Sequence, residues 1–229
     1  NFYKNNGIDY TNSGGNGTAM RIQPHVWSCK NLSDRKYAAS VIKDSLVTHG
    51  HLLAICGALL HADALQYALI NGKPAGPLEI NGFIDNFTSI PSVIHEIYEL
   101  NNFWLPNWEI MSGNKLPEEV ERIRLESKEY LSKALNAAKE NSDISDKYKS
   151  AINALECNKD SRRGAATNTA IASSLLCHFY KNSSPYEAII SCVNVLGTDT
   201  DSIGSMAGAI LGCYNGIPEW DIQDSNYII

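Results

Sequence analysis

Apolar side chains recur at helical spacing along most of the chain. In residues 34–47 the apolar positions fall on one face of a helix, and Ser33 before them is expected to be its N-cap. The same spacing predicts further helices at residues 49–70, 89–100, 117–139, 145–155, 164–180, 185–195 and 201–214. Sustained alternation of apolar and polar residues, which is typical of strands, is absent. The pattern therefore predicts an all-α fold.

The most apolar stretch, residues 52–70, contains His61, Asp63 and Gln66. A segment this short, with three polar side chains, matches a bilayer poorly. We expect it to be a buried helix that ends at Asn71 and Gly72, and we expect no membrane partner.

Two further patterns predict how the helices pack. Residues 117–150 are the most polar part of the chain, which is typical of an outer helix pair with ion pairs between residues four apart. Gly204, Gly208 and Gly212 lie four residues apart on one helical face. We expect them to let another helix approach closely.

Composition excludes several classes of protein. The 229 residues carry a formal net charge of −6 without a block of Lys and Arg, which argues against direct nucleic-acid binding. Six cysteines stand singly, as expected for buried free thiols in a reducing compartment. No leader pattern opens the sequence, so a cytoplasmic location is expected. We expect residues 1–229 to form one domain.

The sharpest local motif is residues 197–204, where Asp199 and Asp201 stand one residue apart and Ser202 follows. Carboxylate and hydroxyl oxygens are the ligands that Mg²⁺, Mn²⁺ and Ca²⁺ prefer. An EF-hand is excluded because its twelfth position, here Ile210, needs a Glu. Asp201 or Ser202 could instead cap the helix that follows, so the motif alone leaves two readings, a metal site or a cap.

Two other segments carry chemistry of a compatible kind. Residues 13–18 form a loop rich in Gly and Asn, whose glycines are free to take positive φ and whose N–H groups can converge on an anion. The alternative is an ordinary turn. Residues 48–51 read Thr-His-Gly-His, and the first of these histidines, His49, stands at an expected helix start, where it could donate to a phosphate.

Together and in this order, the three segments resemble the ADP-ribosylglycohydrolase family, which includes the enzyme that reactivates dinitrogenase reductase and the eukaryotic ADP-ribosyl hydrolases. Residues 15–21 are similar to the family's G-N-G-x-A-M-R loop, residues 48–51 to T-H-x-H, and residues 197–204 to G-G-D-T-D-T-I-G. Residues 164–180 and 208–216 add weaker matches. The resemblance runs from about residue 13 to 216, although the middle rests on helical layout alone.

The resemblance implies a compact orthogonal bundle with a cleft for ADP-ribose and two Mg²⁺ or Mn²⁺ ions. It further implies a hydrolase that frees ADP-ribose from a modified protein or other acceptor. Three residues fall on the family's C-terminal metal ligands: Asp199, Asp201 and Ser202. Six fall on the substrate-binding positions: Ser13, Gly14, Gly15, Asn16, Gly17 and His49.

One departure separates this chain from the family pattern. The family's other metal ligands, a T-D-D or S-D-D motif and an acid near a G-D-x-x-G region, lie upstream of the G-N-G loop, and neither stands in this sequence, which begins with Asn1. We therefore expect either the C-terminal part of a longer enzyme or a diverged member with an incomplete metal site. The second case would be a non-catalytic module that binds ADP-ribose or a nucleotide.

Overall fold

Two buried helices, α5 (Leu52–Asn71) and α11 (Ala166–Phe179), lie side by side at the centre of the structure, a computed structural model that describes residues 9–216. The other helices, in chain order, are η1 (Tyr10–Asn12), α2 (Gly17–Arg21), α3 (Gln23–Trp27), η2 (Leu32–Asp34), α4 (Tyr37–Thr48), α6 (Pro77–Asp85), η3 (Asn86–Ser89), α7 (Ile90–Glu96), η4 (Leu100–Trp104), α8 (Leu105–Ser112), α9 (Leu116–Lys139), α10 (Ile144–Ala154), α12 (Pro185–Val193) and α13 (Thr200–Asn215). Residues 9–216 contain no strand, so the predicted all-α fold is confirmed.

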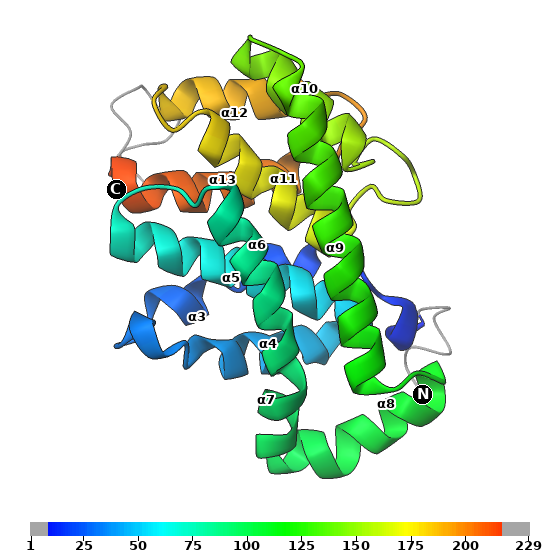
Figure 1. The fold of residues 1–229 in the computed structure, drawn as a ribbon. Coiled ribbons are helices and arrows are strands. Elements are labelled where there is room, and N and C mark those ends of the chain that lie inside the picture. The colour runs from blue at the N-terminus through cyan, green and yellow to red at the C-terminus, as the bar shows by residue number, and fades with distance from the viewer. Residues whose placement is uncertain (1–8, 217–229) are drawn as a thin grey trace.

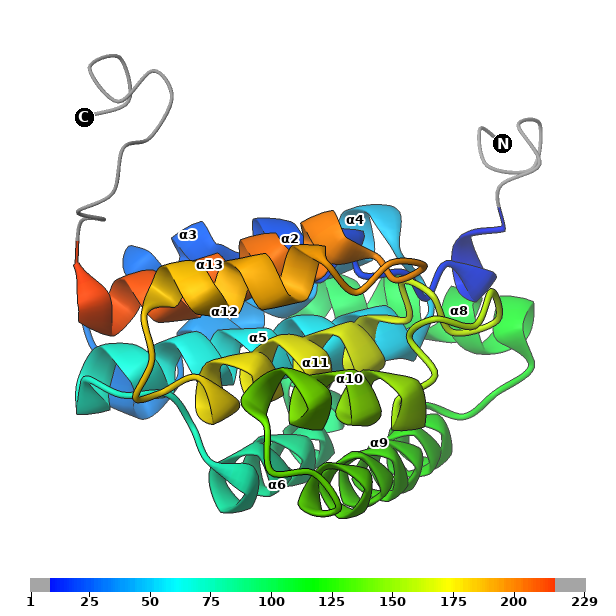
Figure 2. The same cartoon turned by 90° about the horizontal axis from the view of Figure 1, so that it is seen from above.

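The helices pack in layers that cross one another. Seen from above, α5 and α11 lie between α2, α4 and α13 on one side and α6 and α9 on the other (Figure 2). The long helix α9 crosses the central pair steeply, with α10 packed against it (Figure 1). As expected, α9 carries surface ion pairs on its own face, among them Arg122 with Glu126 at 2.9 Å.

Helix α5 is apolar because it is enclosed by other helices. In the described part of the chain it alone is long and apolar enough to cross a membrane, and 72% of its most apolar window is buried inside the bundle. Gly72, at φ 61°, ends it through a bond to the carbonyl of Ala68, as the sequence predicts.

The expected close helix contact is made by a different glycine. Among residues 9–216, a Cβ added to Gly208 or Gly212 would meet no atom within 4 Å, and one on Gly204 only the sulfur of Cys192 at 4.0 Å, so the expectation of a close helix contact at this stripe was wrong. A Cβ on Gly57 would instead lie 2.5 Å from the carbonyl carbon of Ala166. Gly57 therefore allows α5 to contact the start of α11 directly. The spacing of glycines along a helix does not show which side of that helix contacts a neighbour.

Gly57→Ala is expected to lower the free energy of unfolding by about 2 kcal/mol, because the methyl group must push backbone apart. Gly208→Ala is the matched control. It is expected to raise the stability by roughly 0.5 kcal/mol, because alanine has the better helix propensity and the site is open. Urea unfolding of both variants measures the difference, and equal effects would contradict this account of the contact.

Several expected boundaries shift. Helix α4 begins at Tyr37, with Lys36 rather than Ser33 as its N-cap, because Ser33 belongs to the separate turn η2. Four short helices, α2, α3, α6 and α8, were not predicted. Three of them carry Pro in the first turn, where proline is favourable, although in a sequence it is easily taken for a break.

A buried histidine lies in the middle of α5. His61 is fully buried, neither of its ring nitrogens has a hydrogen-bond partner within residues 9–216, and burial lowers its pKa to about 3. The folded protein therefore holds His61 neutral, whereas the unfolded chain protonates it below its usual pKa of roughly 6.5.

Lowering the pH from 7.5 to 5 is therefore expected to reduce the free energy of unfolding by about 2 kcal/mol through His61 alone. The reduction continues until the pH approaches the pKa of His61 in the folded protein, about 3. His61→Leu should abolish this part of the pH dependence, since other histidines titrate equally in both proteins. Urea unfolding at several pH values provides the test. An unchanged slope in the variant would show that His61 is not the group responsible.

Candidate functional site

The glycine-rich loop, residues 13–17, runs between η1 and α2 and pairs with the start of α11. The carbonyl of Gly14 accepts a hydrogen bond from the N–H of Ala166 at 3.3 Å, and Gly15 forms an isolated antiparallel bridge with Ala165. None of the loop glycines takes the positive φ that is open to them. The loop lies against the His49 ring: a Cβ on Gly17 would be 3.6 Å from one of its ring carbons, an ordinary contact distance.

The corner between α4 and α5 holds the two histidines of residues 48–51. His49 is the C-cap of α4 and has extended backbone, so its expected place at a helix start was wrong. His51 is instead the N-cap of α5, and its Nδ1 accepts from the N–H of Leu53 at 3.0 Å. The two histidines therefore differ: His51 caps a helix, and His49 faces the glycine-rich loop.

Arg21 and Thr48 hold the His49 ring. The Arg21 guanidinium donates to the Thr48 hydroxyl at 2.9 Å, and that hydroxyl lies 2.8 Å from Nδ1 of His49. Arginine can only donate, so the hydroxyl is the acceptor of the bond from Arg21. Burial, with a smaller effect of Arg21, lowers the pKa of His49. The ring is thus mainly neutral at pH 7, and its Nε2 lies on the side of Gly15 and Gly17.

Asp199 stands before α13, within reach of the glycine-rich loop. It is the N-cap of α13 by position, yet its side chain makes no cap hydrogen bond; its Oδ2 accepts from Nδ2 of Asn16 at 2.7 Å. Asp201 lies exposed in the first turn, and Ser202 is buried. The reading in which Asp201 or Ser202 caps this helix was therefore wrong.

The two carboxyl groups of the motif interact unfavourably when both are charged. Burial raises the pKa of Asp199, and its hydrogen bond with Asp201 raises it further. The same bond lowers the pKa of Asp201. A divalent cation would relieve this repulsion, and two carboxylates beside a hydroxyl are a suitable hard-oxygen donor set. Residues 9–216 hold no group of three acidic, His or Cys side chains that could bind a metal, so the donor set fits part of a site.

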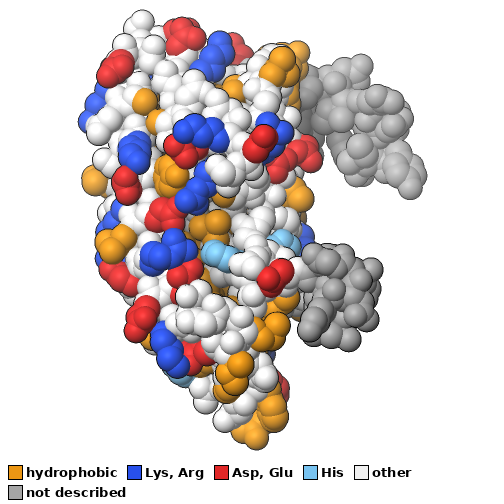
Figure 3. Space-filling view, turned by 90° about the vertical axis from the view of Figure 1, so that its right-hand side faces the viewer, with side chains coloured by type: hydrophobic (Ala, Val, Ile, Leu, Met, Phe, Trp, Pro, Cys, Tyr) orange, Lys and Arg blue, Asp and Glu red, His pale blue; other side chains and the backbone are white. Residues whose placement is uncertain are grey.

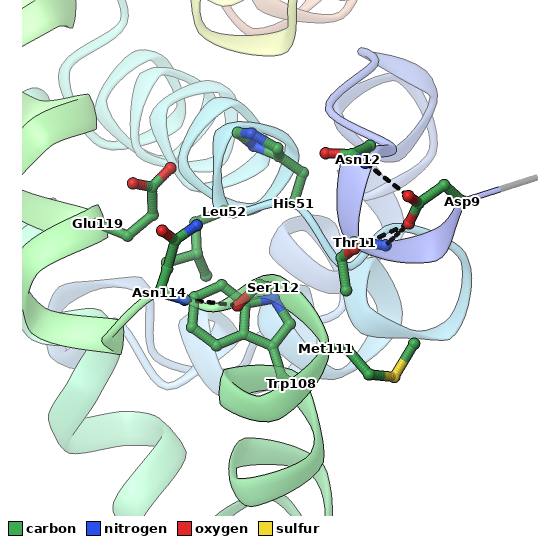
Figure 4. A pocket seen from close by; sticks show the side chains of 10 residues that line it. All are labelled: Asp9, Thr11, Asn12, His51, Leu52, Trp108, Met111, Ser112, Asn114 and Glu119. Carbon is green, nitrogen blue, oxygen red and sulfur yellow. Dashed lines mark hydrogen bonds between the residues drawn. The ribbon is translucent and has the colours of Figure 1, made fainter.

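Beyond the Gly14 end of the loop lies a cavity of roughly 130 Å³. Asn12 of η1, His51 and Glu119 of α9 surround it, and Trp108 of α8 lies below them (Figure 4). It is thus a polar recess next to the glycine-rich loop, because a Cβ on Gly14 would lie 3.4 Å from the His51 ring that lines it.

The face shown in Figure 3 carries basic and acidic side chains interspersed, with no broad basic area on it. Histidine side chains lie there within mostly uncharged surface. This face therefore lacks the extended basic surface that follows a nucleic-acid backbone.

A profile of the ADP-ribosylglycohydrolase family matches residues 2–224. The chain belongs to the ADP-ribosylglycohydrolase family. No curated protein matches it. The family indicates a hydrolase that acts on ADP-ribosylated substrates in general.

In this member of the ADP-ribosylglycohydrolase family, Asn16 joins two motifs that are far apart in sequence. Its Nδ2 donates both to Asp199 and to the hydroxyl of Thr169, at 3.1 Å, across separations of 183 and 153 residues. The glycine-rich loop, His49 and Asp199 thus lie together. Asp201 and Ser202 follow on α13.

Sequence reasoning missed three supporting residues. Thr169 gave no signal, because a threonine inside a helix is common. The pattern predicts only a helix start at Gly164, yet this residue has φ 76° and a Cβ there would lie 3.2 Å from Oδ2 of Asp199. Arg21 belongs to the loop motif but its sequence gives it no role, although its position four residues after Gly17 on α2 places it at the end of α4.

Proposed function

We propose that this chain is a metal-dependent ADP-ribosyl-acceptor hydrolase. It removes ADP-ribose by hydrolysing the N- or O-glycosidic bond between ribose C1 and a modified protein or other acceptor. The observation that carries this proposal is the 2.7 Å bond from Asn16 to Asp199, which joins the loop suited to a pyrophosphate to the carboxylates suited to a cation.

The residues divide into two groups. Ser13, Gly14, Gly15, Asn16 and Gly17 bind the phosphates and the adjoining ribose through backbone N–H groups and the Asn16 side chain. His49 supports this role, since its ring lies beside the loop with Nε2 near Gly15 and Gly17.

Asp199, Asp201 and Ser202 would hold Mg²⁺ or Mn²⁺, as one half of a two-ion site. When bound, such ions polarise water and hold ribose hydroxyls as positive charge develops at C1. The chain's own part is to keep the Asp199 carboxylate oriented, through Asn16 on one oxygen and the close backbone of Gly164 beside it.

Removal of the metal tests the function. The chain is incubated with an ADP-ribosylated protein, and free ADP-ribose is quantified with Mg²⁺, with Mn²⁺ and with EDTA. We expect release in both metal buffers and a loss of at least about 100-fold in EDTA, because no ion then polarises the attacking water or holds the ribose hydroxyls. ADP-ribose binding by calorimetry without any release would contradict hydrolysis and indicate a binding module instead.

A further inference from the structure

The connection between α10 and α11, residues 155–165, ends against the site. We call it the rim loop. Its last residues make the contacts already described: Gly164 beside the Asp199 carboxylate and Ala165 paired with Gly15. The N–H of Ala165 donates to the carbonyl of Arg162 at 3.0 Å, so the backbone of Arg162 holds the residue that pairs with the glycine-rich loop.

Helix α9 holds the rim loop at two points. The Arg162 guanidinium donates to Oε1 of Glu126 and lies over the ring of Tyr130, with its central carbon 5.3 Å from the ring centre. The Tyr130 hydroxyl donates to Glu156 at 3.2 Å, and Glu156 has left-handed backbone with φ 58°. Glu156, the second residue of the rim loop, is therefore strained, and such a loop needs contacts to keep one conformation.

The Arg162 contact is the stronger of the two attachments. Its side chain is 27% exposed and that of Glu126 20% exposed, so solvent screens this pair less than it screens most surface pairs. Glu126 is itself oriented, because its other oxygen accepts from Arg122 at 2.9 Å. Arg163, the next residue, instead pairs with Asp160, whose side chain is 94% exposed.

We infer that Arg162 is a positioning residue for the proposed metal site: it fixes the rim loop on α9 so that Gly164 and Ala165 hold Asp199 and the glycine-rich loop in register. This inference rests on the proposed function. Arg162 touches neither Asp199 nor the loop glycines with its side chain in the described contacts, and its effect passes through the backbone at residues 162–165.

The test measures the Mg²⁺ concentration that gives half of the maximal ADP-ribose binding, by calorimetry below the melting temperature of every variant. Arg162→Met should raise this concentration on the order of tenfold, as removal of groups that orient metal ligands does. Arg162→Lys should restore part of the effect because it keeps the charge. Arg163→Met is the matched control, with the same loss of charge from the same loop, and should leave the value unchanged.

Two further measurements separate the possible failures. In Arg162→Met the amides of Ala165 and Ala166 should exchange hydrogen faster, and adding Glu126→Gln should cause no further loss of Mg²⁺ affinity, since the pair acts as a unit. A lower melting temperature with an unchanged half-saturating Mg²⁺ concentration would reduce Arg162 to a structural role and overturn the inference alone. Absence of Mg²⁺-dependent ADP-ribose binding in the unmodified chain would overturn the proposed function, and the positioning role with it.

Discussion

Asp199→Ala is expected to lower the rate of ADP-ribose release on the order of 10²- to 10³-fold, while the helical fold stays intact. The loss of rate follows from removing a ligand of the proposed ion, which would then be held too weakly to polarise water and orient the ribose hydroxyls. Stability should change by less than about 1 kcal/mol, because the variant loses one hydrogen bond from Asn16 and is relieved of the repulsion by Asp201. Initial rates and thermal unfolding are measured on the same preparations.

Two variants sharpen this test. Asp199→Asn keeps an oxygen for Asn16 but has no charge, so it should lose nearly as much activity as Asp199→Ala. Asp146→Ala is the matched control, because it makes the same change of net charge on α10. There an oxygen of Asp146 lies 3.6 Å from Nζ of Lys149 in an exposed ion pair, so this variant should keep full activity. Full activity in Asp199→Asn would show that this carboxylate binds no ion that the reaction needs.

The sequence predicts well what depends on local pattern. The end of α5 at Gly72 and the surface ion pairs of α9 both follow from residues that are neighbours along one helix. Gly57 shows where such reasoning stops, because its importance lies entirely in Ala166, more than a hundred residues away.

The candidate site shows the same limit. Asn16 and Asp199 each stand in a recognisable motif, but no periodicity relates residues separated by 183 positions, and only the family resemblance grouped them. His49 and His51 illustrate a finer limit. Only Gly50 separates them, yet His49 follows the end of α4 at Thr48 and His51 precedes the start of α5 at Leu52. Helix ends are the least predictable feature of a helical pattern.

Asp63→Ala is expected to lower the free energy of unfolding by about 3 to 5 kcal/mol, since it leaves a partly buried charge without its partner. The Asp63 carboxylate is 2% exposed. It accepts four hydrogen bonds: two from Arg35 at 3.0 and 2.8 Å, one from Tyr37 at 2.7 Å and one from Asn86 at 2.8 Å. Burial raises the pKa of Asp63, and Arg35 is the main opposing influence. Urea unfolding measures the loss.

Tyr37 provides the control that identifies the cause. Its ring is buried, and its hydroxyl donates to Asp63. Tyr37→Phe alone should cost about 1 kcal/mol, the value of one hydrogen bond. In the Asp63→Ala background the same change should cost nothing, because the hydroxyl has already lost its acceptor. Asp160→Ala, at an exposed ion pair, should change stability by less than about 0.5 kcal/mol. Additive losses at Asp63 and Tyr37 would mean that the network around Asp63 does not act as one unit, and that α4, α5 and η3 are joined by apolar packing alone.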